Sequence, residues 1–335
     1  MRSSRYNSPV ADQSIAHYNL LELLGRGALG EVYRARDTRV GRTVALKVLE
    51  PALIADETRR LALLDEARLA ATLSHPNIAT LFDVSDAAGV SYLAYEFAAG
   101  ASLRAEMGGR AMNPRRAVEL CAQVSDALAD GHAAGILHGD LRPETIVVTA
   151  KGSAKLLDFG MWRWTRGGLI RRAAGRAPQS LPDEDAAIAA YMAPEQALGG
   201  QMDGRADVFA LGTILYEMLT GRHPFIAASV SDTVMNIVRS APPPPSSLNE
   251  AVPGDLDAII TRTLAKDLEN RFQSAASLSA ELRTAALALD VRSDERSGDY
   301  LLPVDDEADK VPLLVWIAGI GGVAVMAALL WWTVR

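Results

Sequence analysis

The sequence predicts an α+β fold of two lobes, followed by one C-terminal transmembrane helix. Strand-like segments rich in β-branched and aromatic residues dominate from Tyr18 to about Phe97, with one helical interruption. Helical patterns dominate from about Ala98 to Ala286. The stretch Leu313–Trp332 carries no charged residue. Because a helix of about 20 residues is ~30 Å long, this stretch matches the thickness of one bilayer core.

The individual elements follow from local composition. Three segments of the first lobe lie between glycine-containing turns, and we expect strands over Glu31–Arg36, Thr43–Leu49 and Ser91–Phe97. The helical interruption is expected over Glu57–Ser74, because this stretch has no Gly or Pro and is rich in Leu, Ala, Glu and Arg. In the second lobe, Ala206–Gly221 shows the same helical character.

The same patterns set the predicted domain boundaries. A polar tail, which we expect to be flexible, precedes the folded domain, and a charged, polar linker follows it. The predicted boundaries are 1–17 for the tail, about 18–97 and about 98–286 for the two lobes, 287–311 for the linker and 312–334 for the transmembrane helix.

Composition excludes several kinds of site and partner. The net charge of −7 argues against nucleic acid as the main partner, because phosphate backbones bind basic surfaces. Cys121 is the single cysteine, so an intrachain disulfide and a cysteine-based zinc site are both excluded. The five histidines are scattered without metal-binding spacing, and the N-terminal stretch lacks the apolar segment of a signal peptide.

The uncharged C-terminal stretch has further features of a membrane span. Trp316, Trp331 and Trp332 lie near its two ends, where amphipathic rings favour the membrane interface. The alternative is a buried C-terminal helix, but core helices of this length normally have a polar face. Ala318 and Gly322, four residues apart, suit close contact between two such helices, so a homodimer stays open.

Three glycines form the spacing G-x-G-x-x-G in "LLGRGALGEV", at Gly25, Gly27 and Gly30. Glycines let the backbone close over phosphates and present amide donors without steric cost. A dinucleotide-binding fold carries the same spacing, but there it opens a helix. Here the following "EVYRARD" has strand composition, which disfavours that alternative.

Charged residues follow on the predicted strands and helix. Lys47 lies on a predicted strand, where an inward-pointing lysine is costly unless it is paired. Glu66, in the middle of the predicted helix of the first lobe, is its expected partner; alone it would be interpreted as part of a solvated helix face. Asp158 in "LLDFG" ends an apolar strand-like run, where a carboxylate suits a hard divalent cation bound to phosphates.

In this order, the elements from about Tyr18 to Ala286 resemble the protein kinase signature set, and in particular bacterial members of the eukaryotic-like serine/threonine kinase family. The resemblance implies ATP and Mg²⁺ as cofactors, with Mn²⁺ as an alternative metal. The implied ATP-binding residues are Gly25, Gly27, Gly30, Val32, Ala45, Lys47, Glu66, Glu96 and Ala98.

The resemblance also implies roles in catalysis. Asp140 in "HGDLRPET" is implied to be the base that accepts the substrate hydroxyl proton, together with Lys47 and Arg142 as cations at the phosphates. The implied metal ligands are Asp158 and Thr145. Asp207 resembles the aspartate that braces the catalytic loop. Two further residues, Glu195 in "YMAPEQ" and Arg271, are expected to form a structural ion pair.

The sequence departs from the family pattern His-Arg-Asp-Leu-Lys-Pro-x-Asn. Gly139 replaces the arginine that usually receives an activation-segment phosphate, and Arg142 replaces lysine with a planar fork. Thr145 replaces the asparagine that binds the second metal, so weaker binding of that ion is expected. Ala187 and Ile188 stand where the family usually has Gly-Thr, and Ile188 cannot make the threonine's hydrogen bonds.

Two functions are therefore predicted. The first is ATP-dependent phosphotransfer to Ser or Thr of proteins in membrane-associated signalling, which is favoured because Lys47, Glu66, Asp140 and Asp158 are all present. The change at Thr145 predicts that this transfer is slow. The alternative is a pseudokinase, a nucleotide-binding or scaffolding module at the membrane. Lys310 and Arg335 flank the span and barely decide its orientation. The need for ATP predicts a cytoplasmic domain with the C-terminus across the membrane.

Overall fold

The computed structural model describes residues 13–87, 89–165 and 189–298. The chain divides into two compact units, Met1–Ala288 and Leu289–Arg335. Of the second unit, only residues 289–298 are described, and they are helical. The predicted transmembrane segment 312–334 lies outside the described residues. Within the described ranges, no helix combines the length and the apolar character that a bilayer crossing needs.

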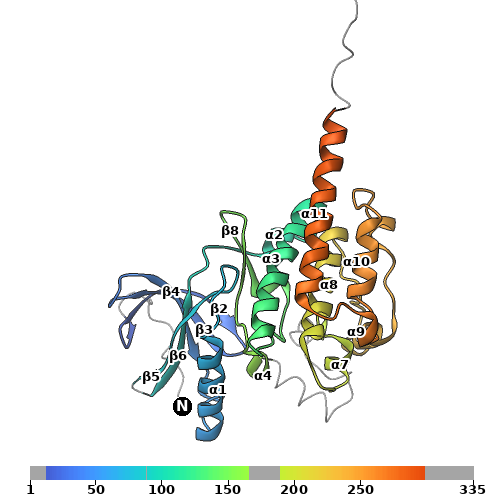
Figure 1. The fold of residues 1–335 in the computed structure, drawn as a ribbon. Coiled ribbons are helices and arrows are strands. Elements are labelled where there is room, and N and C mark those ends of the chain that lie inside the picture. The colour runs from blue at the N-terminus through green and yellow to red at the C-terminus, as the bar shows by residue number, and fades with distance from the viewer. Residues whose placement is uncertain (1–12, 88, 166–188, 299–335) are drawn as a thin grey trace, which may run out of the picture. The chain divides into compact units, whose positions relative to one another are not determined.

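The first lobe is built on an antiparallel six-stranded sheet with one helix beside it (Figure 1). The sheet order is β1-β2-β3-β4-β6-β5. Its strands are β1 (Ser14–Ile15), β2 (Tyr18–Gly27), β3 (Gly30–Asp37), β4 (Thr43–Leu49), β5 (Leu81–Ala87) and β6 (Val90–Glu96). The helix α1 spans Glu57–Ala70 and packs against β5. The strands and the helix that the sequence predicts in this lobe are confirmed, with shifts of a few residues at their ends.

Local chemistry explains where α1 begins. The Asp56 side chain accepts a hydrogen bond of 2.8 Å from the Arg59 backbone N–H, which satisfies one of the unpaired donors of the first turn. One face of α1, with Leu63, Leu64 and Ala67, is buried. This face joins Leu29 of the β2–β3 turn in a single apolar cluster.

The second lobe is mainly helical, as the sequence predicts. Its helices are α2 (Leu103–Met107), α3 (Pro114–Ala133), α4 (Trp162–Thr165), α7 (Pro194–Ala197), α8 (Gly204–Thr220), α9 (Val230–Arg239), α10 (Asp255–Thr263) and α11 (Ala275–Gly298). Short 3₁₀ turns span Pro143–Thr145, Pro245–Ser247 and Leu268–Asn270. A small antiparallel sheet has the order β7-β8-β9, with β7 at Gly100–Ser102, β8 at Ile146–Thr149 and β9 at Ala154–Leu156.

Helix α8 is the core of this lobe. Every residue from Ala206 to Leu219 is buried, and α3 and α10 pack against it (Figure 1). Asp203 caps its N-terminus by accepting from the Arg205 N–H at 2.9 Å, and Gly221 ends it in the left-handed conformation with φ of 70°. Asp207, in the first turn, is therefore fixed in the buried interior.

The last helix runs beyond a predicted boundary. The predicted domain ends at residue 286 and a predicted linker follows it, whereas α11 continues to Gly298. The interval 275–297 contains no Gly or Pro, so nothing in the backbone interrupts the helix.

Candidate functional site

A cavity of about 300 Å³ takes its lining from both lobes. Most of the lining is apolar, and the charged exceptions are Lys47, Glu96 and Asp158. Six of the residues expected to bind cofactor or metal line it, namely Val32, Ala45, Lys47, Glu96, Ala98 and Asp158. Phe97 lies within the segment Glu96–Ala98, which the resemblance implies for the hinge beside ATP, and five further lining residues were not predicted, namely Leu24, Tyr95, Gly100, Val147 and Leu157. Leu24 and Tyr95 directly precede the predicted residues Gly25 and Glu96. Their position next to these residues in the sequence is the signal that could have identified them.

The three predicted glycines form the end of the β2–β3 hairpin. Gly25 pairs with Val32, and Gly27 pairs with Gly30. Gly30 has a φ of 140°, and a Cβ there would lie 1.9 Å from the Val48 carbonyl oxygen, so the fold itself requires glycine. A Cβ at Gly25 or Gly27 would meet no atom within 4 Å. Packing therefore does not require glycine at these two residues, and both leave room for a ligand to approach the backbone.

Lys47 and Asp158 form an ion pair in this cavity. The Lys47 Nζ donates to Asp158 Oδ1, and Lys47 is buried. Asp158 has a φ of 58°, an uncommon backbone conformation for a residue that is not glycine. The Tyr95 ring lies 5.6 Å from the Lys47 Nζ, and burial together with the charge of Asp158 raises the pKa of the Tyr95 phenol.

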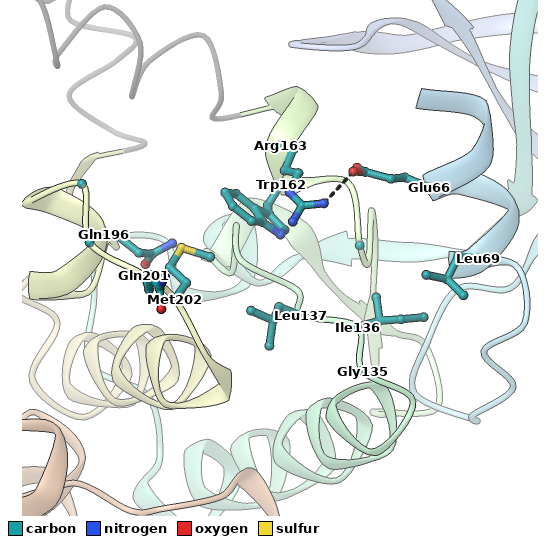
Figure 2. Close-up of a pocket in the computed structure, with 13 residues that line it drawn as sticks. Glu66, Leu69, Gly135, Ile136, Leu137, Trp162, Arg163, Gln196, Gln201 and Met202 are labelled. Carbon is teal, nitrogen blue, oxygen red and sulfur yellow. Dashed lines mark hydrogen bonds and ion pairs between the residues drawn. The ribbon is translucent and has the colours of Figure 1, made fainter. Parts of the chain in front are cut away.

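The prediction that Glu66 pairs with Lys47 is wrong for this structure. Glu66 Oε1 lies 2.7 Å from Arg163 Nη1, and Glu66 Oε2 accepts from Trp164 Nε1–H at 2.7 Å. Both partners belong to α4, the short helix after Asp158. Figure 2 shows Arg163 directed at Glu66 beside a second cavity of about 490 Å³, which is also lined by Trp162 and Gln196. Sequence spacing identified two complementary charges, but each has a nearer opposite partner.

The loop that contains Asp140 is held from below by Asp207. The backbone N–H groups of His138 and Gly139 donate to the Asp207 carboxylate at 2.9 and 2.7 Å, and His132 Nε2 lies 2.8 Å from it. Burial alone would raise the pKa of Asp207, but the bond from His132, the charges of His132 and His138 and the Gly139 N–H reverse this, so the pKa is lowered. The predicted bracing role of Asp207 agrees with this geometry.

Leu157 joins this loop to the strand end before Asp158. Its backbone N–H donates to the Thr145 carbonyl at 2.8 Å, and its carbonyl lies 3.1 Å from His138 Nε2. The buried His138 ring also meets the Phe159 ring edge-on, with centroids 5.2 Å apart. Burial lowers the pKa of His138, which disfavours the charged form of the ring.

Asp140 is buried, and Arg142 Nε lies 3.5 Å from its Oδ1. The Thr145 hydroxyl donates to the Arg142 carbonyl at 2.9 Å and accepts from the Arg142 N–H at 3.2 Å. A threonine can make these bonds to its own loop because its hydroxyl lies close to the backbone. The hydroxyl that was expected to bind a second metal is thus engaged by the loop, and its metal role stays a prediction.

The residues fit a divalent cation that shares its ligands with phosphates. Among the described residues, no cluster of three or more acidic, histidine or cysteine side chains forms a metal cage. The Asp158 carboxylate, with its side chain 23% exposed, is the clearest oxygen donor in the cavity. Magnesium commonly uses one or two carboxylates and completes its shell with water and substrate phosphates. Asp158 would therefore hold such an ion, and Thr145 could add a ligand only by giving up a loop bond.

The fold brings four features together between the two lobes. These are the glycine hairpin, the lysine of the neighbouring strand, and two aspartates, one in a loop and one at the end of the strand bonded to that loop. The sequence profile of the protein kinase domain matches residues 18–282. The chain belongs to the protein kinase family. Among curated proteins it is 40% identical over 272 residues to serine/threonine-protein kinase PknB of Mycobacterium tuberculosis and 37% identical over 292 residues to serine/threonine-protein kinase Pkn1 of Myxococcus xanthus.

The matches differ in how much of each protein they cover. They include 79% and 86% of this chain but 42% and 41% of these two kinases, so the chain matches less than half of their length. A solved structure of the PknI kinase domain of Mycobacterium tuberculosis is 26% identical, with a TM-score of 0.64, and covers 82% of this chain and 98% of that domain. The two-lobed kinase fold that the sequence predicts is therefore confirmed.

A second predicted ion pair has the expected structural role. Arg271 donates from Nη1 and Nη2 to the two oxygens of Glu195 at 2.9 and 3.2 Å, and its side chain is fully buried. It also donates to the carbonyls of Arg205 and Ala265 at 2.8 and 3.0 Å. The pair thus ties the kinase's α7 segment to α8 and the α10–α11 connection. Ala187 and Ile188, the predicted departures before this segment, lie outside the described residues.

We expect Asp207→Asn to lower the free energy of unfolding by about 2 kcal/mol at pH 7, because an amide nitrogen would face a backbone N–H in a buried site. The lowered pKa means that Asp207 stabilises the fold above its ordinary pKa of 3.8 and that this contribution is lost as the pH falls through its folded value. The difference in the free energy of unfolding between variant and parent should therefore become smaller below about pH 4. Thermal unfolding of both proteins between pH 7 and below pH 4 measures this difference.

The matched control is Asp130→Asn. Asp130 lies on α3 with its side chain 61% exposed, 3.9 Å from His75. Exposed pairs of this kind contribute little, so this variant should unfold like the parent. An equal loss of stability in both variants, or no loss in Asp207→Asn, would contradict the bracing role.

Proposed function

We propose that this kinase domain transfers the γ-phosphoryl group of ATP to Ser or Thr hydroxyls of proteins. One observation carries the proposal: Leu157 bonds to both ends of the Asp140 loop and directly precedes Asp158, so the expected base and the expected metal ligand are held together. The serine/threonine kinases to which the chain is 36–40% identical support the same acceptor class.

Different residues of the site position the phosphates, compensate their charge and accept the proton. The glycine hairpin has room to cover phosphates, and Lys47 supplies a buried cation beside Asp158. The substrate oxygen forms a bond to the γ-phosphorus as the bond between this phosphorus and the β–γ bridging oxygen breaks, and ADP leaves. The hydroxyl proton passes to an Asp140 carboxylate oxygen. A bound magnesium ion would neutralise charge on the phosphates.

The alternative is a pseudokinase that binds nucleotide without transferring phosphate. Two observations favour it: Glu66 is bound to α4 instead of Lys47, and the Thr145 hydroxyl is engaged by its own loop. Neither removes the base or the cation at the phosphates. Phosphotransfer by the parent protein decides between the two functions.

For Asp140→Asn, we expect phosphotransfer to fall by about 10³-fold, because the amide cannot accept the hydroxyl proton. ATP affinity should change little, since Asp140 is not among the residues that line the nucleotide-sized cavity. The measurement compares radiolabelled phosphate transfer to a generic basic protein with equilibrium ATP binding. Transfer at the parent's rate would show that Asp140 is not the base.

Thr145→Asn should lower the magnesium concentration needed for half-maximal rate and raise the maximal rate. The asparagine amide oxygen reaches further from the backbone than the Thr145 hydroxyl, which donates to the Arg142 carbonyl. A tenfold gain would correspond to about 1.4 kcal/mol of transition-state stabilisation. Thr145→Ser keeps the hydroxyl and is the control, so its magnesium titration at fixed ATP should follow the parent's. Superimposable curves for all three proteins would refute a metal effect at this residue.

We also propose that the segment 312–334 anchors the protein in a membrane as a single pass, with the kinase domain cytoplasmic. The uncharged stretch and its terminal tryptophans support this. Protease added to intact spheroplasts should leave the kinase domain undigested, whereas permeabilised cells should lose it. Digestion of the domain in intact spheroplasts would show that the orientation is the opposite one. Recovery of the intact protein in the soluble fraction would contradict the membrane anchor.

A further inference from the structure

The hydroxyl of Tyr95 is a buried polar group without a partner. Tyr95 is 6% exposed, and no donor or acceptor in the described part of the chain forms a hydrogen bond with its hydroxyl oxygen. A buried hydroxyl that makes no hydrogen bond is costly, so native structures retain few of them. Among the described residues that line the cavity of about 300 Å³, Tyr95 alone has a buried side-chain nitrogen or oxygen in this condition.

The register of the sheet places Tyr95 beside the residues expected to act on phosphate. Tyr95 on β6 pairs with Ala45 on β4, and Lys47 follows Ala45 by two residues, so the three side chains share one face of the sheet. The Lys47 Nζ lies 5.6 Å from the centroid of the Tyr95 ring and donates to Asp158. The ring therefore lies at the end of the cavity to which we assign the phosphates and the metal ion.

The phenol acts as a donor at this end of the cavity. Burial and the negative charge of Asp158 raise the pKa of Tyr95 well above its ordinary value, so the hydroxyl keeps its proton at neutral pH. Ionised phosphate oxygens are strong acceptors of hydrogen bonds. Hydrogen bonds to an ionised acceptor are stronger than those between neutral groups. An anionic oxygen is thus the chemical complement of this hydroxyl.

A buried water is the alternative partner. The Tyr95 ring packs into the apolar cluster that contains Leu63, Ala67 and Met161. A buried water normally makes about three hydrogen bonds, and these side chains offer it none. Lys47 and Asp158 lie on the cavity side of the ring, but they bind each other. These surroundings favour a partner that arrives with the ligand.

We propose that the Tyr95 hydroxyl binds the phosphate end of magnesium-bound ATP, as a hydrogen-bond donor to a phosphate oxygen, directly or through one water. The proposal rests on the proposed phosphotransfer function and adds a binding residue to the same site. The nucleotide gives the hydroxyl its missing partner, so part of the binding free energy comes from this bond. Tyr95 thereby contributes to the affinity for the triphosphate and not to the affinity for the base.

The variant Tyr95→Phe, made in the full-length chain in detergent, removes only the hydroxyl. We expect binding of magnesium with a non-hydrolysable ATP analogue to weaken by about tenfold, because one hydrogen bond to a charged acceptor is lost. Binding of adenosine, which has no phosphate, should not change. An equal loss for both ligands would assign the hydroxyl to the base, and unchanged binding of both would assign it to neither. Either result would overturn the proposal.

The stability of the protein without nucleotide tests the premise, and Tyr216→Phe is the matched control. Tyr216 is also buried, but its hydroxyl donates to the Pro243 carbonyl at 3.0 Å. Tyr216→Phe should lower the melting temperature and leave binding of the analogue unchanged. Tyr95→Phe should melt at the parent's temperature or above, because phenylalanine has no polar group that needs a partner. A loss of stability as large as the control's would show that the Tyr95 hydroxyl has a partner within the protein, and would contradict the premise.

A second variant keeps the test decisive if Tyr95→Phe does not fold. Tyr95→Met also lacks the hydroxyl, and its flexible side chain can fill the same apolar space. The same selective loss of affinity for the analogue is expected, and equal affinities of this variant and the parent would refute the contact.

The outcomes separate this contact from the phosphotransfer function. Weaker binding of the analogue by Tyr95→Phe, without phosphotransfer by the parent, would support the contact and refute phosphotransfer. Unchanged binding by the variant, with an active parent, would refute the contact and leave phosphotransfer intact. No saturable binding of the analogue by the parent would refute both.

Discussion

The buried carboxylate of Asp207 is the constraint on which the rest of the site depends. It accepts hydrogen bonds from the backbone N–H groups of His138 and Gly139, two successive residues in the loop that contains Asp140, and lies beside His132 of α3. A buried carboxylate is stable when such donors compensate its lost hydration. Because Asp207 is fixed in the first turn of the buried helix α8, its hydrogen bonds hold the loop in place against the core of the second lobe.

Leu157, which is hydrogen-bonded to this loop, directly precedes Asp158 and so fixes where Asp158 lies. The charged side chains near Asp158 then form ion pairs with a few partners. Lys47 and Asp158 bind each other, and Glu66 binds Arg163 and Trp164. Each charge is partnered in this arrangement, which buried and half-buried ions require.

Much of the fold and the site could be predicted from the sequence. The strand Thr43–Leu49 has the observed bounds, and the expected helix over Glu57–Ser74 agrees with α1 apart from its last turn. These segments are predictable because β-branched alternation, caps and the absence of Gly and Pro act locally. The Glu195–Arg271 pair was also predicted, since a buried arginine must find a carboxylate. The end of α11 was not, because a polar helix and a polar linker have similar composition.

The sequence by itself determined the family, the residues that we propose to act on phosphate, and the departures at Gly139, Arg142 and Thr145, because these depend on residue type and order. Only the tertiary structure decided the partners of Glu66 and Lys47. Glu66 and Arg163 lie far apart in the sequence, and no local pattern reports that α4 reaches α1. Likewise, the sequence alone indicates only that Gly139 lacks the family's cation. The structure shows that Trp162 fills the space that a side chain at residue 139 would need. Pairing and packing depend on distances in space, which the order of residues does not state.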